Sequence, residues 1–260
     1  MTYGSAAPVI PYQITGFILG DTASVVSGAP SFSTAASSSS AVGAYAITGV
    51  VGSLAASNYA FQINSGTMAV KAAVLTVAAA SATGTYGSAV PAFTFSITGF
   101  VNGDKAIVVS GVPTLSTTAT ANSPAGVYPV TAAAGSLAAA NYTFTCVPGQ
   151  LTIAKAPAKV TANNQSITVG NAVPALTYAV TGLVNGDTAV SALSGTPTVT
   201  TAATSGSAAG SYVITIAAGS MTAKNYALTF VNGTLTIAQS TSSVYNPLPP
   251  PKHLAPTRIN

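Results

Sequence analysis

The chain has 260 residues, of which only ten are charged at pH 7: seven Lys or Arg and three Asp. A charged fraction of 4%, against about a quarter in an ordinary soluble domain, argues against a cytosolic enzyme, and 48% apolar residues argue against disorder driven by charge repulsion. The cations are spread rather than clustered, so nucleic-acid binding is not expected, and no apolar run reaches the roughly 18 residues that a membrane helix needs.

The acidic residues reveal an internal repeat, because Asp21, Asp104 and Asp187 are each 83 positions apart. Of the 24 Gly, 21 recur at seven positions present in all three copies, which indicates turns where the backbone needs a positive φ or a close approach. We therefore predict three tandem repeats of about 83 residues. Their ranges are 1–71, 72–154 and 155–238, joined by very short linkers at 71–73 and 155–158 and followed by a tail at 239–260.

Strands are predicted between the Gly turns, because apolar and polar residues alternate there. Each repeat is expected to open with a strand at 74–80 or 159–164, which the first repeat lacks because its sequence begins at Tyr3. Alternating runs follow, marked in chain order by Ile10, Tyr12 and Ile14; by Phe93, Phe95 and Ile97; by Tyr128 and Val130; by Tyr142 and Phe144; and by Leu176, Tyr178 and Val180. Six or seven short antiparallel strands in each repeat, without helical periodicity, predict an all-β, two-sheet sandwich.

Several segments resemble the MBG/YDG-type Ig-like repeats of large bacterial surface and secreted proteins, including filamentous adhesins. They are Ile-Thr-Gly-Phe-Val-Asn-Gly-Asp at 97–104, the Gly-x-Tyr strand, Ala-Asn-Tyr-x-Phe at 140–144 and Gly-x-Leu-Thr-Ile at 149–153. The resemblance covers residues 1–238 and implies Ig-like β-sandwich modules at the cell surface, with no catalytic motif. The sequence departs from the pattern at Val169, where the family prefers Tyr, and at the missing first strand.

Asp21, Asp104 and Asp187 are the first candidates for a cation site because they are the chain's only acidic side chains. Calcium takes six to eight oxygens, usually with several carboxylates, and each repeat offers one. The preferred interpretation is a hairpin turn, since Asn-Gly is a strong two-residue turn signal and a neighbouring Asp can accept from backbone N–H groups. A weak cation site at each Asp is the alternative, and no cofactor is expected.

Two other groups of residues are interpreted as core rather than as sites. Cys146 aligns with Ile63 and Phe230, where a thiol acts as a small hydrophobe; a nucleophile would need a base, and the only His is His253 in the tail. The recurring tyrosines are predicted to be core residues, with a sugar-stacking platform as the alternative. These tyrosines are Tyr45, Tyr128, Tyr212, Tyr59, Tyr142 and Tyr226.

The tail from Gln239 changes to a Ser- and Pro-rich composition. Pro247-x-x-Pro250-x-Lys252 fits a polyproline-II ligand pattern, but an extended disordered tail is the preferred interpretation.

Similar modules without a catalytic site predict a structural spacer or stalk, about 120 Å long from the rise of its strands, in a bacterial cell-surface or secreted adhesin-like protein. The alternative is a glycan-binding or protein-binding adhesion module that uses loops such as 35–41, 118–124 and 202–208. No enzymatic activity is expected. The expected partners are neighbouring repeats of the same or a longer chain, and a glycan or a host or matrix protein in the alternative.

The missing strand gives a last expectation. Leu75-Thr76-Val77 and Lys159-Val160-Thr161 are predicted to pair along a sheet edge, so the first repeat is expected to expose an unpaired edge, to be the least stable repeat and to self-associate through residues 1–71. Met1 is followed directly by repeat sequence without a signal peptide, which indicates a fragment of a longer protein.

Overall fold

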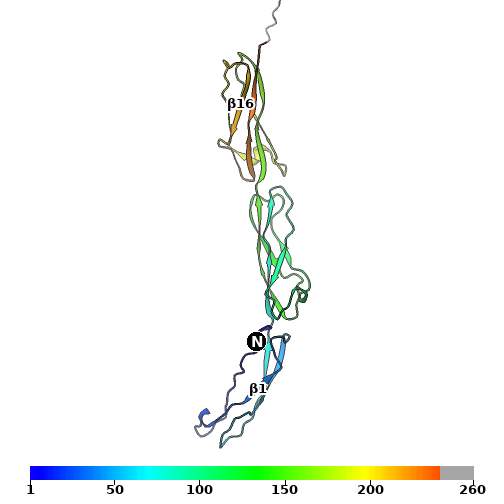
Figure 1. The fold of residues 1–260 in the computed structure, drawn as a ribbon, viewed down its shortest axis with the longest axis vertical. Coiled ribbons are helices and arrows are strands. Elements are labelled where there is room, and N and C mark those ends of the chain that lie inside the picture. The colour runs from blue at the N-terminus through cyan, green and yellow to red at the C-terminus, as the bar shows by residue number, and fades with distance from the viewer. Residues whose placement is uncertain (241–260) are drawn as a thin grey trace, which may run out of the picture. The chain divides into compact units, whose positions relative to one another are not determined.

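The computed structural model describes residues 1–240, and these form two compact units, with the boundary in the chain between Ala154 and Lys155. The first unit contains the first two predicted repeats and the second unit contains the third. Nearly all of the regular structure is β-strand, as Figure 1 shows, so the predicted all-β class is confirmed. His253 and the polyproline-like segment lie outside the described residues.

The second repeat is a complete two-sheet sandwich. One sheet has the order β5 (Ala82–Thr85), β10 (Gly149–Ala154), β8 (Gly126–Ala133) and β7 (Thr114–Ser116). The other has the order β6 (Phe95–Thr98), β4 (Ala73–Ala79) and β9 (Tyr142–Val147). Because side chains alternate along a strand, β4 buries every second residue, and its Leu75 and Val77 are completely enclosed.

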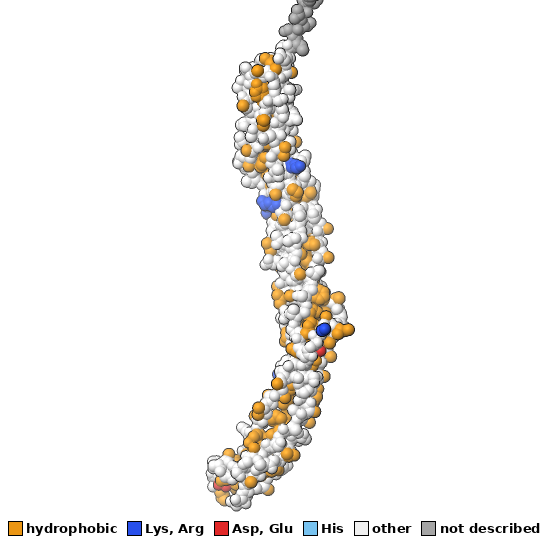
Figure 2. All heavy atoms as spheres, viewed as in Figure 1, with side chains coloured by type: hydrophobic (Ala, Val, Ile, Leu, Met, Phe, Trp, Pro, Cys, Tyr) orange, Lys and Arg blue, Asp and Glu red, His pale blue; other side chains and the backbone are white. Residues whose placement is uncertain are grey.

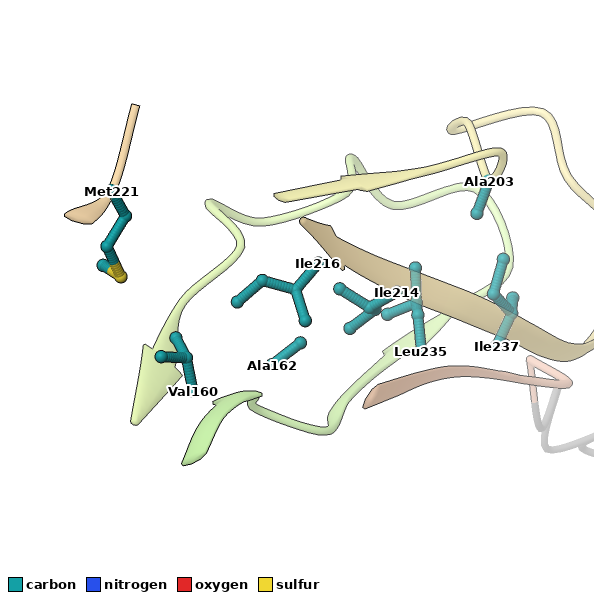
Figure 3. Packing of buried hydrophobic residues seen from close by; sticks show 8 residues of the cluster. All are labelled: Val160, Ala162, Ala203, Ile214, Ile216, Met221, Leu235 and Ile237. Carbon is teal, nitrogen blue, oxygen red and sulfur yellow. The ribbon is translucent and has the colours of Figure 1, made fainter. Parts of the chain in front are cut away.

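The third repeat forms the same sandwich in the second unit. One sheet has the order β12 (Gln165–Thr168), β19 (Gly233–Ala238), β16 (Gly210–Ala217) and β15 (Thr198–Thr201). The other has the order β13 (Tyr178–Thr181), β11 (Ala156–Ala162) and β18 (Tyr226–Val231). A small two-stranded sheet is formed by β14 (Leu193–Ser194) and β17 (Thr222–Ala223). Figure 3 shows its core, in which Val160, Ile214 and Leu235 are completely enclosed. The apolar alternation therefore explains the inner faces of both sheets.

The first repeat has only one of the two sheets, formed by β1 (Ser31–Thr34), β2 (Gly43–Val50) and β3 (Gly66–Val70). The run of Ile10, Tyr12 and Ile14, predicted to be a strand, is not one, and residues 59–64 are not in a strand either. Their counterparts in the second repeat are β6 and β9, which are held together by β4. The first repeat has no counterpart of β4, so its second sheet does not form.

The predicted place of the opening strand is wrong. β4 is the middle strand of its sheet, antiparallel to β6 and parallel to β9, and β11 lies in the same way between β13 and β18. Its absence therefore removes the partner of two segments rather than leaving one open edge. Alternation of apolar and polar residues indicates which face of a strand is buried, but it does not indicate whether the strand lies at the edge or in the middle of its sheet.

One short helical turn follows each Asp, although no helix was expected from the sequence. These turns are η1 (Ala23–Val25), η2 (Ala106–Val108) and α1 (Ala189–Ala192). Thr22 and Thr188 cap two of them with their side chains. Turns of three or four residues are too short to produce a helical period in the sequence.

Amide hydrogen exchange measured on the whole chain should separate the first repeat from the second. Residues 12–15 and 59–64 should exchange faster than the equivalent residues 95–98 and 142–147, because only the latter belong to a hydrogen-bonded sheet. Strand β2 serves as the internal control, since it is paired on both sides. Equal protection of the two sets would contradict the loss of the second sheet.

Candidate functional site

Each of the three candidate Asp residues closes a tight two-residue turn. The two preceding residues have positive φ: Leu19 (56°) and Gly20 (84°), Asn102 (54°) and Gly103 (79°), Asn185 (55°) and Gly186 (74°). The Asp104 N–H donates to the Val101 carbonyl at 2.9 Å, and the other two turns close in the same way. Asn and Gly tolerate this left-handed conformation, which is why the Asn-Gly-Asp sequence folds here.

A tyrosine hydroxyl donates to each Asp carboxylate, from a residue 38 or 39 positions later in the chain. The distances to Oδ2 are 2.7 Å for Tyr59 and Asp21, 2.8 Å for Tyr142 and Asp104, and 2.6 Å for Tyr226 and Asp187. The hydroxyl also accepts the N–H of the first turn residue, for example Val101 at 3.1 Å. We call this arrangement the Tyr–Asp pair. It ties the turn to the segment that carries the tyrosine.

In the first two repeats the surroundings of the Tyr–Asp pair favour the neutral phenol. The pKa of Tyr142 is raised above its ordinary 10.0, chiefly because burial disfavours the phenolate. The hydrogen bond from Val101 lowers this pKa, but the hydrogen bond to Asp104 and the charge of Asp104 raise it. The pKa of Tyr59 is raised as well: the hydrogen bond at Ile18 lowers it, and the hydrogen bond to Asp21, burial and the charge of Asp21 together outweigh that effect.

The carboxylates are engaged singly, so their chemistry is that of hydrogen-bond acceptors. Within residues 1–240 no group of three or more His, Cys, Asp and Glu side chains lies together. Asp21 and Asp104 belong to the same unit, and each holds its own tyrosine. A cation at such a turn would have one carboxylate, and one oxygen of that carboxylate is already hydrogen-bonded.

In the first unit the turn of the second repeat also contacts the first repeat. The Tyr3 hydroxyl donates to the same Asp104 Oδ2, at 3.0 Å. The Tyr3 and Tyr142 rings meet edge to face, with centroids 5.5 Å apart. Gly4 lies so close to Val101 that a Cβ at this position would overlap the valine side chain. The Tyr3-Gly4 pair of one repeat is thus fitted to the Asp turn of the next.

Polar side chains on both sides complete this junction. The Asn102 side chain donates to the Ser38 carbonyl at 2.7 Å, and the Val42 N–H donates to the Asn141 side chain at 3.0 Å. The Asn of the Asn-Gly turn therefore has a second role, since it reaches the preceding repeat. The sequence predicted the turn but not this contact.

The core of the first unit runs through the junction. β3 ends at Val70 and β4 begins at Ala73, so the chain passes between the repeats almost without a loop. One buried cluster draws residues from both repeats: Tyr3, Ala36, Met68, Val70, Ala73, Leu75 and Tyr142. The two repeats are therefore joined by apolar packing as well as by hydrogen bonds. The sequence did not predict the role of Tyr3, because the recurrence of a tyrosine before a glycine does not indicate which residue its hydroxyl contacts.

The remaining candidates occupy structural positions. Cys146 is half-buried on β9, on the same face as Tyr142 and Phe144, and is opposite Val77 of β4. The other recurring tyrosines are half-buried and donate their hydroxyls to the carbonyl four residues earlier. These bonds are Tyr45 to Ala41, Tyr128 to Pro124 and Tyr212 to Ala208, at 2.9–3.0 Å. Each fixes the start of its strand to the preceding loop.

Comparison with known protein families gives one match that covers most of the chain. The family model MBG domain (YGX type) matches residues 1–69, 75–152 and 158–236, which confirms the resemblance drawn from the sequence. No curated protein matches the chain. Within residues 1–240 no helix is long and apolar enough to cross a membrane.

Replacing Leu19 by Asn should stabilise the first unit. Leu19 has a φ of 56° and is 97% exposed, at the position where the other repeats carry Asn. A left-handed conformation costs a non-Gly residue about 1–2 kcal/mol, and Asn is better suited to it. We expect Leu19→Asn to raise the unfolding free energy by about 1 kcal/mol in urea titrations. Val9→Asn, at an equally exposed position, is the control and should change it by less than about 0.5 kcal/mol.

Tyr142→Phe should lower the stability of the first unit and weaken its dependence on alkaline pH. Loss of a hydrogen bond to a charged group costs about 1.5–3 kcal/mol. Because folding raises the pKa of Tyr142, its contribution is fully present below pH 10.0 and is lost as the pH rises through the folded-state pKa. Urea unfolding between pH 7 and 11 should show a smaller alkaline decline in Tyr142→Phe. A decline identical to that of the unsubstituted chain would contradict this role.

Proposed function

This chain belongs to the family of YGX-type MBG domains, and from that premise we propose that it is a structural spacer, a stalk segment of a bacterial cell-surface or secreted protein. The family makes the chain a repeat module typical of large surface proteins. The spacer role is the finer proposal. It holds that the repeats separate other parts of a longer protein and catalyse no reaction.

The junction between the first two repeats is the observation that carries the proposal. The most distinctive polar group of a repeat, its Asp carboxylate, accepts a hydroxyl of its own repeat and, at Asp104, a hydroxyl of the neighbouring repeat. A binding site usually presents a few polar groups toward an open pocket. Here the polar groups hold a turn and a neighbour, which is what a spacer requires.

The surface composition also supports a spacer. Figure 2 shows very few charged side chains on the face in view, in keeping with the ten charges of the whole sequence. Charge steers partners toward a binding surface, and acid–base catalysis needs titratable groups near one another. Within residues 1–240 charges are sparse, and each acidic side chain is already engaged by a tyrosine hydroxyl that holds a turn, which favours a structural role.

An adhesion module is the second candidate, and exposed apolar side chains beside the Asp turns favour it. Ile107 and Val190 occupy the same position in the second and third repeats, on the short turn after the Asp, and each is 93% exposed. Apolar groups held at such a tip can insert into a partner. In this reading the loops bind a glycan or a host or matrix protein.

Small-angle scattering tests the spacer proposal. A rod of about 120 Å, as expected from the strand rise, has a radius of gyration of about 35 Å, whereas a globule of 260 residues has about 18 Å. We expect a value near the former and one maximum dimension much longer than the others. A radius of gyration near 18 Å would contradict the spacer proposal.

A glycan and matrix-protein array tests the second candidate. Adhesion predicts specific binding that falls about tenfold or more in the Ile107→Ser/Val190→Ser variant, because the tips lose their apolar contact. Val112→Ser, which replaces another exposed apolar residue, is the matched control. Binding at background level for the unsubstituted chain would rule out adhesion to the molecules on the array and leave the spacer proposal intact.

A further inference from the structure

A groove lies in the first repeat where the second sheet is absent. It has a volume of about 500 Å³ and is bordered by residues 10–15 and 60–64 and by the inner face of the remaining sheet. Half-buried apolar side chains line it, including Ile14, Phe32, Ile47, Phe61 and Ile63. The groove is thus an incomplete core that opens to solvent.

The backbone on both sides of the groove is unpaired. Within the described residues, no backbone hydrogen bond joins residues 12–15 or 60–64 to another part of the chain. The equivalent segments of the second repeat, β6 and β9, both pair with β4. In the third repeat β13 and β18 both pair with β11. Two copies within this chain therefore show what fills the place: a single extended strand.

Two glycines keep space for such a strand. A Cβ at Gly99 would lie 2.8 Å from the Val74 carbonyl oxygen, and one at Gly149 would lie 2.7 Å from that of Ala79. Gly182 and Gly233 meet β11 in the same way, at Pro157 and Ala162. Their counterparts in the first repeat are Gly16, with nothing within 4 Å, and Gly66, where the nearest atom is 3.7 Å away on Ile47. Both ends of the slot are open.

We propose that this groove is a strand-acceptor site, which can take up one extended polypeptide segment of the β4 and β11 type. Such a segment has small or medium apolar residues at its first, third, fifth and seventh positions, as in Ala73, Leu75, Val77 and Ala79, and as in Ala156, Ala158, Val160 and Ala162. Main-chain hydrogen bonds to both neighbours would provide affinity, and the alternate side chains would fill the groove. The positions between these residues can be polar, since Lys159 is exposed on β11.

The register of the bound segment follows from the repeat spacing. Its fifth residue, in the place of Val77, lies between Ile14 and Ile63, because Val77 is opposite Ile97 and Cys146. Its first residue lies opposite Tyr59 and its third opposite Phe61. The segment runs parallel to residues 59–64 and antiparallel to residues 12–15.

Titration of the full chain with a labelled peptide tests the proposal. The peptide copies residues 155–163 (Lys-Ala-Pro-Ala-Lys-Val-Thr-Ala-Asn), whose two lysines keep it soluble. We expect saturable binding by fluorescence anisotropy, and new protection of residues 12–15 and 59–64 in hydrogen exchange. A control peptide with Asp in the places of Ala158 and Val160 should bind at least about tenfold more weakly, because it would bury two carboxylates.

A glycine variant of the chain locates the site. Gly66→Ala fits the free groove but would collide with the Ala162 carbonyl of the peptide, which takes the seventh position of the segment, so the peptide should bind at least about tenfold more weakly. Gly43→Ala is the matched control: Gly43 also begins a strand, its added Cβ would meet only Tyr45 at 3.9 Å, and peptide binding should be unchanged.

Three results would overturn the proposal. They are no peptide binding, equal binding of the Asp control peptide, and equal binding to Gly66→Ala and Gly43→Ala. Sedimentation velocity of the chain alone tests whether a second copy of the chain occupies the groove. A dimer that excludes the peptide would assign the groove to a second copy instead. None of these results bears on the spacer proposal, which rests on the junction between the first two repeats and on the surface composition.

Discussion

The parallel pairing of a repeat's entering strand with a strand near its end is the constraint on which the sandwich depends. In the second repeat β4 pairs with β9 about seventy residues later, and in the third β11 pairs with β18 in the same way. A parallel pair cannot be closed by a hairpin, so the whole repeat must fold between the two strands. The first repeat demonstrates the dependence: without the entering strand, its segments at 12–15 and 59–64 carry suitable alternation but form no sheet.

The Tyr–Asp pair fixes one corner of the sandwich. The tyrosine opens β9 or β18, directly beside the entering strand, and its hydroxyl reaches the carboxylate that closes the turn after β6 or β13. The same carboxylate at Asp104 accepts Tyr3 of the preceding repeat. Folding of one repeat therefore prepares the surface on which its neighbour rests. At Asp104 a single acidic residue therefore serves both tasks.

Much of this architecture could be predicted from the sequence, and what was missed has a physical reason. The repeat spacing and the alternation located β6, β8, β9 and β13, and the Asn-Gly-Asp sequence marked a turn, because these signals are local. The middle position of β4 was missed because pairing partners lie far apart in the chain. The Tyr3–Asp104 contact was missed for the same reason, since Tyr3 and Asp104 are 101 residues apart and no charge pattern links them.

The parallel arrangement of the first and last strands has a mechanical consequence. β4 and β5 run parallel to β9 and β10, and β11 and β12 run parallel to β18 and β19. A force that stretches the chain pulls these neighbours in opposite directions along their length, so the hydrogen bonds between them are sheared together instead of opening one by one. The first repeat retains only the Thr2–Lys71 bridge of this kind. Within residues 1–71 fewer hydrogen bonds are therefore loaded in shear than in the other two repeats.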